Sequence, residues 1–504
     1  MKIHNQGPSV ISVHDLLVDK ASGSLDGFRR AYFACLTRRR DALFELSDAV
    51  LCTDGPVRSL PGLSLVAEHR RGHGALYDAL AAGRIDVQRL GTTLAATPIP
   101  RAADGRIVLA VDVTCWLRPE AHTSPQRILC HTYGRGKDQH IGVPGWPYSF
   151  VVALESGRSS WTAPLDAVRL APGADLAAVT AAQLRDVLSR LIESGHWASG
   201  DPAVWVVMDA GYDPARLAWL LRDLPVRVLA RLRSDRVLRR QPPPWVPRVH
   251  GGRKPRHGGE FAFGDPASWA EPDVTTTTGT RLYGTATARA WHRLHPRLTR
   301  RAAWADCPDL PILHGTVVRL EVERLPSGAN AKPVWLWWST GIGEDHHEPD
   351  PDPATINLLW QVFLRRFDIE HTFRMLKQTL GWTVPKLRDP HAADRWTWLI
   401  IAAYTQLRLA RTLAADLRRP WERPAPPERL TPARVRRGFR HLRAALTCPA
   451  SAPKPSRPGP GRPPGRPNRQ PTRHHDVHTT TSGEPGKPKP SKTKSTNPQP
   501  RRTG

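Results

Sequence analysis

Hydrophobic positions recur at helical spacing through the first part of the chain. The recurring positions are Leu25, Phe28, Tyr32, Leu36, Leu43, Leu46 and Val50. Ser24 directly precedes this run, and serine is a residue type that caps helices, so we expect a helix to begin there. Shorter helices are expected over 64–71, 75–82 and 86–95, with glycine turns between them. Residues 1–100 are therefore predicted to form a helical domain.

Two interpretations fit this helical domain. Its short helices carry basic residues, which is typical of a helix-turn-helix that reads the end of a DNA segment. These basic residues are His69, Arg70, Arg71, Arg84 and Arg89. Alternatively, the helices pack as a subdomain on the domain that follows.

From residue 105 to 232 the pattern changes to apolar strands that alternate with helices. The expected strands are 107–112, 128–133, 148–154, 203–208 and 226–232, and the expected helices are 175–193 and 213–221. The order β-β-β-α-β-α-β is that of a ribonuclease-H-like fold, an α/β class with a mixed sheet flanked by helices.

Residues 233–350 are rich in Pro, Gly, Thr and Trp and are predicted to be a β-rich insertion. Its expected strands are 259–263, 281–288, 315–322 and 334–339. A basic turn inside it contains Arg253 and Lys254 and is expected to lie on phosphates. Helical spacing resumes over 353–380 and 394–417, so we expect residues 351–446 to complete the core.

Charge narrows the possible partners. The 504 residues carry a formal net charge of +27 and a pI near 10.8, which favours a polyanion such as nucleic acid. No apolar stretch is long enough to span a bilayer, and the first residues lack the apolar core of a signal peptide. The six cysteines contain no C-x-x-C pair, which disfavours a zinc knuckle and a disulfide framework. We expect a cytoplasmic protein associated with the nucleoid and not with a membrane.

The last segment, 447–504, is predicted to be a disordered basic tail. It holds 12 Lys or Arg residues against two acids, together with 14 prolines. Gly461-Arg462-Pro463 and Gly465-Arg466-Pro467 resemble the cores of AT-hooks, which insert an arginine into the minor groove. Because the usual flanking Arg or Lys is missing, a nonspecific basic tail is favoured.

Two acids directly follow apolar strands. Asp112 follows Ile107–Val111, and Asp209 follows Val204–Met208. An ionised carboxylate beside buried apolar residues is costly unless it is paired or bound to a metal. The topology makes the two strands neighbours, and ligands gather at the carboxyl ends of strands in such sheets.

A third acid lies in the helix that follows the insertion. Arg366, Glu370, Arg374 and Lys377 are spaced by four, four and three residues and so share one helical face. A solvated face of ion pairs would explain these residues in an isolated helix. The two strand-end aspartates favour a shared site instead. Asp368, two residues before Glu370, faces another side.

These motifs resemble a group of insertion-sequence DDE transposases. The segment Phe363-x2-Arg366-x3-Glu370-x6-Lys377 matches the Y-x2-R-x3-E-x6-K signature at three of four positions, with Phe in place of Tyr. Asp112-Val113-Thr114 is similar to the D-x-T of the family, and Asp209-Ala210-Gly211-Tyr212 to its D-x-G-Y. The intervals of 97 and 161 residues between the acids fit the subgroup with a β-rich insertion before the glutamate.

The resemblance implies a chemistry for these residues. Three carboxylates can hold two Mg²⁺ ions, for which Mn²⁺ substitutes, and two ions can activate a nucleophile and stabilise a leaving oxygen. We expect Asp112 to bridge both ions, Asp209 to bind one and Glu370 the other. Arg366 and Lys377 would bind phosphates of the DNA end, with Arg374 beside them. No small-molecule cofactor is expected.

The predicted function is strand cleavage and strand transfer at the ends of an insertion sequence. Double-stranded DNA is the expected partner, and a homodimer is expected in the synaptic complex. Two alternatives remain at this point: a ribonuclease-H-like nuclease without strand transfer, and a degenerate relative that only binds DNA. The insertion contains several Trp residues that could stack on a flipped base, but strand packing is the favoured role of Trp335, Trp337 and Trp338.

Overall fold

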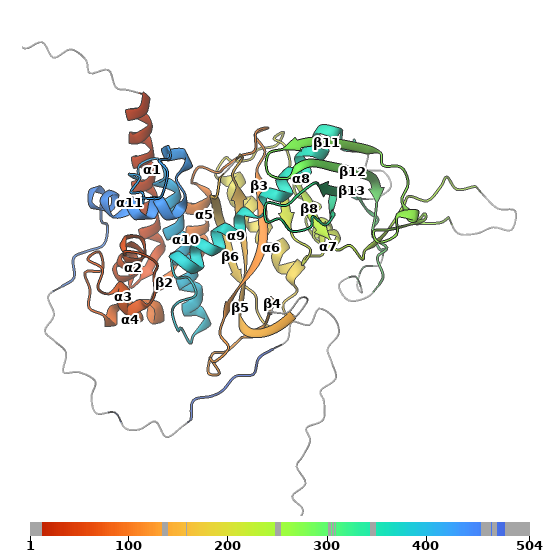
Figure 1. The fold of residues 1–504 in the computed structure, drawn as a ribbon. Coiled ribbons are helices and arrows are strands. Elements are labelled where there is room, and N and C mark those ends of the chain that lie inside the picture. The colour runs from red at the N-terminus through yellow and green to blue at the C-terminus, as the bar shows by residue number, and fades with distance from the viewer. Residues whose placement is uncertain are drawn as a thin grey trace, which may run out of the picture.

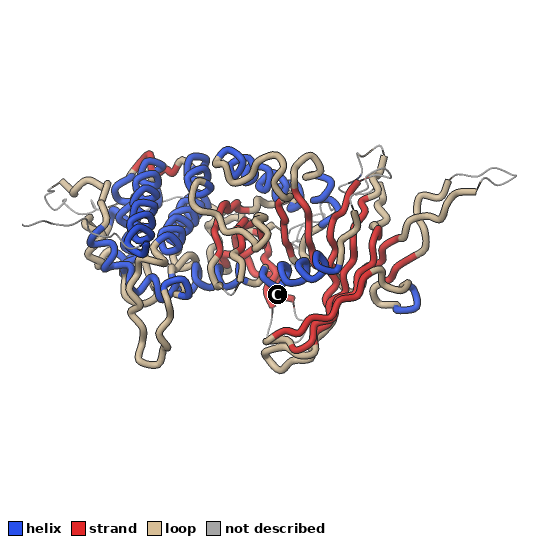
Figure 2. Tube along the Cα trace, turned by 90° about the horizontal axis from the view of Figure 1, so that it is seen from above, coloured by secondary structure: helices blue, strands red, loops and turns tan. Residues whose placement is uncertain are grey.

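The computed structural model describes residues 13–133, 140–157, 159–246, 254–300, 304, 307, 309–342, 349–454, 465 and 471–478. A ten-stranded sheet runs through the molecule, and a bundle of helices covers one end of it (Figure 1, Figure 2). Arg253 and the arginines of both Gly-Arg-Pro repeats lie outside the described residues.

One half of the sheet has the ribonuclease-H-like arrangement that the order of elements predicted. Its strands are β3 (Val108–Leu117), β4 (Ile128–Tyr133), β5 (His140–Leu154), β6 (Thr162–Arg169), β7 (Val204–Met208) and β8 (Val226–Leu232). β3 pairs in parallel with β7, and β7 in parallel with β8. β5 pairs antiparallel with β3, β4 and β6. The predicted mixed sheet is therefore confirmed.

The strand β6 was not predicted. Its sequence contains Pro164 and Asp166, which are both depleted in strands. A register shift between Val151 and Val152 of β5 accommodates the proline at this point. Six consecutive residues of β6, from Thr162, are buried, so tertiary packing outweighs the local propensity.

The strands of the predicted insertion continue the same sheet. They are β11 (Val274–Thr280), β12 (Gly284–Leu294), β13 (Leu313–Val322) and β14 (Val334–Ile342). β14 pairs antiparallel with β8, so the sheet runs in the order β11-β12-β13-β14-β8-β7-β3-β5-β4. A separate hairpin joins β9 (Val237–Arg239) and β10 (Glu260–Ala262). β9 and β11 were not expected from the sequence.

Alternating residues of the central strands belong to two hydrophobic cores, one on each face of the sheet. Leu109 and Val111 of β3 pack on one side with α6 (Leu176–Glu193) and α7 (Pro214–Leu220). Val108 and Ala110 pack on the other side, where helices from both ends of the chain gather. The central part of the sheet is thus covered on both faces, as expected for strands that read as continuous apolar runs.

Helices before the sheet follow the prediction with two corrections. They are α1 (Val13–Cys35), α2 (Arg40–Cys52), α3 (Leu60–Leu63), α4 (Gly74–Ala82) and α5 (Val87–Ala95). Ser24 lies inside α1 and caps nothing, because the helix begins well before it. The helix expected over 64–71 is absent, because the Glu45 carboxylate accepts hydrogen bonds from the backbone N–H and the guanidinium of Arg70 and holds the segment in a turn.

The N-terminal helices are built into the body of the protein. All residues of α2 from Ala42 to Cys52 are buried. Arg29 of α1 binds Asp48 of α2 at 2.7 Å and donates to Gln406 at 2.6 Å. Asp48 also pairs with Arg443 at 2.6 Å. This packing favours the subdomain interpretation over a free helix-turn-helix, while a role in DNA binding stays a prediction.

The helix expected over 353–380 is interrupted. It consists of α8 (Pro353–Arg365), α9 (Asp368–Arg374) and the π-helical turn η3 (Met375–Thr379). The helix expected over 394–417 is α10 (Pro390–Leu409), which begins earlier because the Asp389 side chain caps it, with Pro390 in the first turn. The helix α11 (Pro432–Ala445) follows and was not predicted.

Two described parts of the predicted tail contact the body. Ala450 is buried, and its carbonyl accepts a hydrogen bond from Arg70. His478 forms a parallel bridge with Ile128 at the edge of the sheet, beside β4. These contacts differ from the disorder expected for the whole of 447–504, because the edge of a sheet offers unpaired backbone groups to any nearby chain.

Candidate functional site

The sheet brings Asp112 and Asp209 side by side. Because β3 and β7 run parallel with Val111 opposite Met208, the next residue of each strand occupies the same level. β7 ends at Met208, so Asp209 follows a strand as expected. β3 instead continues to Leu117 along β5, so Asp112 lies within its strand and not at its end. Asp112 is the first residue of β3 beyond its pairing with β7, which ends at Val111.

Glu370 reaches the same place from α9. This short helix packs on the sheet through Ile369 and Phe373, and the Phe373 ring lies 5.3 Å from Phe150 of β5 in an edge-to-face contact. Phe150 is opposite Asp112 in the register of β3 and β5. Anchoring α9 here places Glu370 next to the two aspartates.

Arg366 joins the three acids. Its Nη1 lies 3.1 Å from Oδ2 of Asp112, and its Nη2 lies 3.5 Å from Oδ2 of Asp209 and 3.3 Å from Oε1 of Glu370. The arginine occupies the turn between α8 and α9 and is only 7% exposed. The three sequence-predicted carboxylates therefore converge on one buried guanidinium.

Burial and charge perturb the first aspartate. The pKa of Asp112 is raised to about 6, mainly by burial and also by the carboxylates of Asp209 and Glu370, while Arg366 and the backbone N–H of Val113 act in the opposite direction. Burial also holds the pKa of the Tyr212 hydroxyl well above its usual value, and Asp112 adds to that effect. Perturbed groups that gather in this way are typical of functional sites.

The remaining predicted basic residues differ in their position. Lys377 lies in η3 with Nζ 5.8 Å from the Trp382 ring, and burial lowers its pKa while Asp112 raises it. Arg374 is exposed at the end of α9. The helix expected over 353–380 breaks between α8 and α9 and becomes π-helical after α9. The predicted single helical face of Arg366, Glu370, Arg374 and Lys377 is therefore not straight. Lys254 is exposed in the segment that leads to β10.

Sequence reasoning missed Arg231. It lies on β8, one residue after Ala230, which is opposite Met208 of β7. Its Nη1 is therefore 3.7 Å from Oδ1 of Asp209, on a half-exposed side chain. The pairing of two parallel strands could have predicted this contact, since it puts the residues after Met208 and Ala230 side by side.

The donor set suits a hard divalent cation in chemistry, because all three groups offer carboxylate oxygens. Within the described part of the chain, however, no group of three or more His, Cys, Asp and Glu side chains has the spacing of a metal site. The Arg366 guanidinium lies between the carboxylates and supplies the positive charge there. The three carboxylates are therefore suited to bind a divalent cation, provided that the Arg366 side chain moves away from them.

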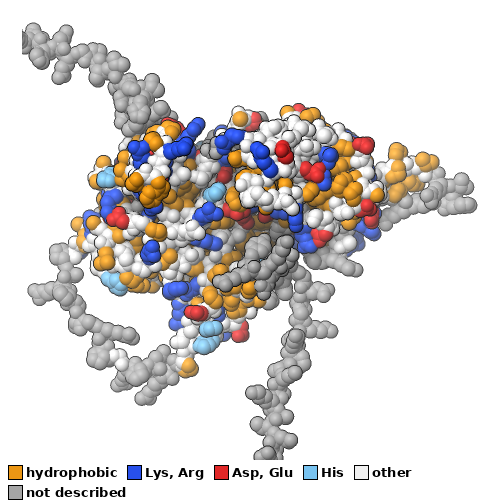
Figure 3. Space-filling model, in the orientation of Figure 1, with side chains coloured by type: hydrophobic (Ala, Val, Ile, Leu, Met, Phe, Trp, Pro, Cys, Tyr) orange, Lys and Arg blue, Asp and Glu red, His pale blue; other side chains and the backbone are white. Residues whose placement is uncertain are grey.

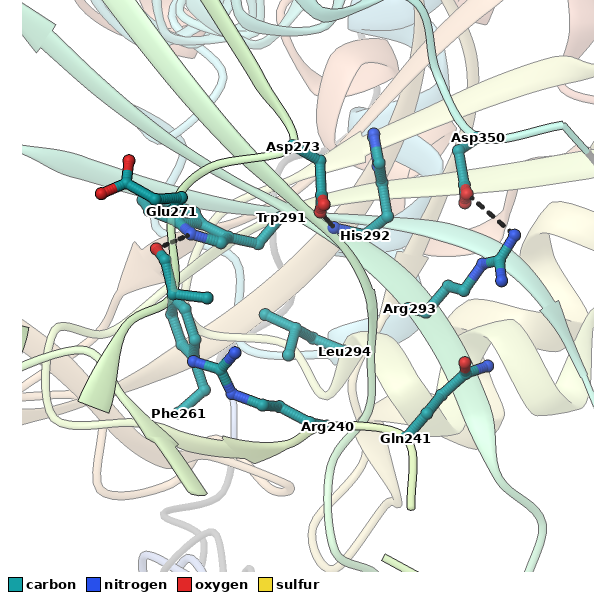
Figure 4. A pocket seen from close by; sticks show the side chains of 11 residues that line it. Arg240, Gln241, Phe261, Glu271, Asp273, Trp291, His292, Arg293, Leu294 and Asp350 are labelled. Carbon is teal, nitrogen blue, oxygen red and sulfur yellow. Dashed lines mark hydrogen bonds and ion pairs between the residues drawn. The ribbon is translucent and has the colours of Figure 1, made fainter. Parts of the chain in front are cut away.

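A hollow lies toward the outer strands of the sheet, and none of the three acids lines it. It has a volume of about 490 Å³ and is bounded by the β9–β10 hairpin and the end of β12 (Figure 4). Two pairs of its polar groups bind each other: Arg293 binds Asp350 at 3.1 Å, and Asp273 accepts from the His292 N–H at 2.7 Å. Trp335, Trp337 and Trp338 are buried in β14, which confirms strand packing.

Two further observations concern the surface charge and the length of the apolar helices. Lys and Arg side chains are spread over the face in Figure 3, with acids among them. None of the helices in the described ranges is long and apolar enough to cross a bilayer.

A family model described as DDE superfamily endonuclease matches residues 31–297, just over half of the chain. The match includes Asp112 and Asp209, while Glu370 lies beyond it. No curated protein matches the chain. Endonucleases of this superfamily generally use divalent metal ions, and the family indicates a nuclease or transposase type of activity with DNA as substrate. With this match and its ribonuclease-H-like sheet, the chain belongs to the DDE transposase family of endonucleases.

Proposed function

We propose that the protein is a transposase that cuts DNA at the ends of an insertion sequence and joins them to a target. The observation that carries this proposal is the convergence of Asp112, Asp209 and Glu370 on one position from β3, from the end of β7 and from α9. Acids from three separate segments gather at a cost, because their charges repel, and such an arrangement is typical of a site that binds cations.

Two bound Mg²⁺ ions, for which Mn²⁺ substitutes, would activate a water or the 3′-OH of a DNA strand as the nucleophile and stabilise the leaving oxygen. In this proposal Asp112, the most buried of the three acids, would be a ligand of both ions, while Asp209 and Glu370 would each be a ligand of one. Arg366 and Lys377 bind phosphates of the cut strand. Arg374, Lys254 and Arg253 contact the backbone farther along the DNA.

The proposed assembly is a homodimer that holds two DNA ends in a synaptic complex. Residues 105–232 and 351–446 form the catalytic core, and the β-rich segment 233–350 extends it. The basic tail, 447–504, adds nonspecific affinity for the duplex, because its 12 Lys or Arg residues release counterions when they bind phosphates. The proposed association of the protein with the nucleoid follows from this nonspecific affinity for DNA.

Replacing one carboxylate tests the proposal. In a cleavage and strand-transfer assay on the DNA that flanks the gene, Glu370→Gln should lower the cleavage rate by at least about 10³-fold, because the loss of one ligand disrupts a metal site that must stabilise the transition state. Glu193→Gln is the matched control, because Glu193 is exposed at the end of α6. It should cut at the wild-type rate.

The same assay separates the alternatives. Metal-dependent cutting without joining would favour a nuclease that lacks strand transfer. DNA binding by wild type without any cutting would favour a degenerate relative. Equal cutting by wild type and Glu370→Gln would contradict the assignment of Glu370.

A further inference from the structure

The Arg366 guanidinium occupies the space that the three acids share. Both of its Nη atoms face carboxylate oxygens, at 3.1, 3.3 and 3.5 Å. Nε of Arg366 is buried and has no hydrogen-bond partner among the described residues. Among the described residues, the guanidinium of Arg366 therefore has polar contacts only with the three carboxylates. No other hydrogen bond of the guanidinium would be broken if it moved away.

A guanidinium in this place resembles a bound cation in its effect. It offsets the repulsion among the three carboxylates, because it lowers the pKa of Asp112 while Asp209 and Glu370 raise it. The side chain is 7% exposed, so water screens this interaction only weakly. A divalent cation bound by the same oxygens would meet the positive charge of Arg366 at close range.

We infer that Arg366 is a built-in occupant of the metal position in the DNA-free protein, and that a divalent cation enters only when the guanidinium leaves. This inference rests on the proposed function, since it names the same three carboxylates as ligands. Once the Arg366 guanidinium has moved away from the carboxylates, it lacks a counter-charge, and a DNA phosphate is an anion that can bind it.

This exchange couples the two ligands of the protein. Without DNA, the cation competes with Arg366, so its apparent affinity is reduced by the fraction of molecules in which the position is open. DNA binding gives the guanidinium an alternative partner and opens the position. By reciprocity, the cation then strengthens DNA binding by the same factor.

Titration calorimetry of Mn²⁺ into the full chain without DNA tests the inference. Arg366→Gln should bind Mn²⁺ about tenfold more tightly than wild type, as expected when an occupant that closes about nine-tenths of the sites is removed. Arg231→Gln is the matched control, because Arg231 also lies beside Asp209 but stands outside the acid cluster. It removes the same charge and should tighten Mn²⁺ binding by about twofold or less, because water and salt screen a half-exposed charge more than a buried one.

Thermal unfolding provides a second readout if the variant is less stable. Without metal, Arg366→Gln should melt below wild type, because three carboxylates lose their counter-charge. Saturating Mn²⁺ should raise its melting temperature by more than it raises that of wild type. A short duplex should tighten Mn²⁺ binding to wild type and leave Arg366→Gln nearly unchanged.

The outcomes separate the inference from the proposed function. Weaker or unchanged Mn²⁺ binding by Arg366→Gln, with normal binding by wild type, would overturn the inference and leave the transposase proposal standing. Equal tightening in Arg366→Gln and Arg231→Gln would also overturn it, because general electrostatics would then suffice. If neither wild type nor Arg366→Gln binds Mn²⁺, the metal site itself is wrong, and both proposals fall.

Discussion

Asp112 and Asp209 show what single residues in the sequence could predict. Each follows a run of apolar residues, and parallel pairing of the two strands brings them to one level. The contact of Arg366 with both aspartates could not be predicted. Helical spacing pairs Arg366 with Glu370, but its approach to the sheet depends on the turn between α8 and α9, where the predicted helix breaks. That turn is stabilised by tertiary contacts that a local pattern does not contain.

The pKa of Asp112 leads to a prediction at this scale. Its pKa in the folded protein is raised to about 6 from its usual value of 3.8, so the folded protein binds this proton more tightly than the unfolded chain does. The contribution of Asp112 to stability therefore falls as the pH rises from about 4 to 6, by on the order of 2–3 kcal/mol. Asp112→Asn should reduce this fall when urea unfolding with a metal chelator is measured across that range. Identical pH profiles of the two proteins would contradict the prediction.

Elements with a regular pattern were predicted well, and those with an interrupted pattern were missed. The helix α6 was expected from residue 175, and Asp175 does cap it. The strand β6 was missed because Pro164 and Asp166 are unusual in strands, and its pairing with β5 and its burial come from tertiary structure. The strands 281–288 and 334–339 were predicted, but their membership in the central sheet was not, because pairing partners far apart in the sequence leave no local signal.

Gly145 of β5 provides a test at the scale of elements. A Cβ at Gly145 would lie 2.6 Å from the Trp116 carbonyl oxygen and 3.0 Å from Cα of Leu117, both backbone atoms of β3. Gly145→Ala should therefore push β5 from β3 and lower the free energy of unfolding by about 1–3 kcal/mol. Because Asp112 lies on β3, DNA cleavage should fall as well.

Gly142 is the matched control on the same strand. A Cβ there would meet the Leu129 side chain at 3.5–3.7 Å, which is ordinary contact. Gly142→Ala should change the free energy of unfolding by less than about 1 kcal/mol, since alanine costs little where space allows. Chemical denaturation of both variants checks the pair, and equal losses would mean that close packing at Gly145 is not the cause.

On the scale of the whole molecule, the N-terminal helices and the C-terminal helices form one unit. Arg29, Asp48, Gln406 and Arg443 connect α1, α2, α10 and α11 through buried hydrogen bonds and ion pairs. Composition and periodicity predicted helices at both ends of the chain. They could not predict that the two sets interlock, because the partners are separated by more than 350 residues.

Removing the central acid of this network should destabilise the entire protein. Asp48→Ala leaves the guanidinium of Arg29, which is fully buried, without its counter-charge, and the expected loss is about 3–5 kcal/mol. Asp78→Ala is the control, because Asp78 pairs with Arg39 at the surface, and its loss should stay below about 1 kcal/mol. Calorimetry should show one transition for both ends of the chain. Separate melting of the N-terminal helices in Asp48→Ala would contradict the single unit.

The pairing of β14 with β8 has a mechanical consequence. Since β8 also pairs with β7, a continuous ladder of hydrogen bonds runs from the outer strand β11 to the strand that precedes Asp209. The outer strands are thus the far end of a stiff plate and not a hinged appendage. A displacement of β11 would be passed along this ladder to β7, which Asp209 directly follows, and to β3, which carries Asp112. DNA gripped at the rim would in this way steer the site that acts on it.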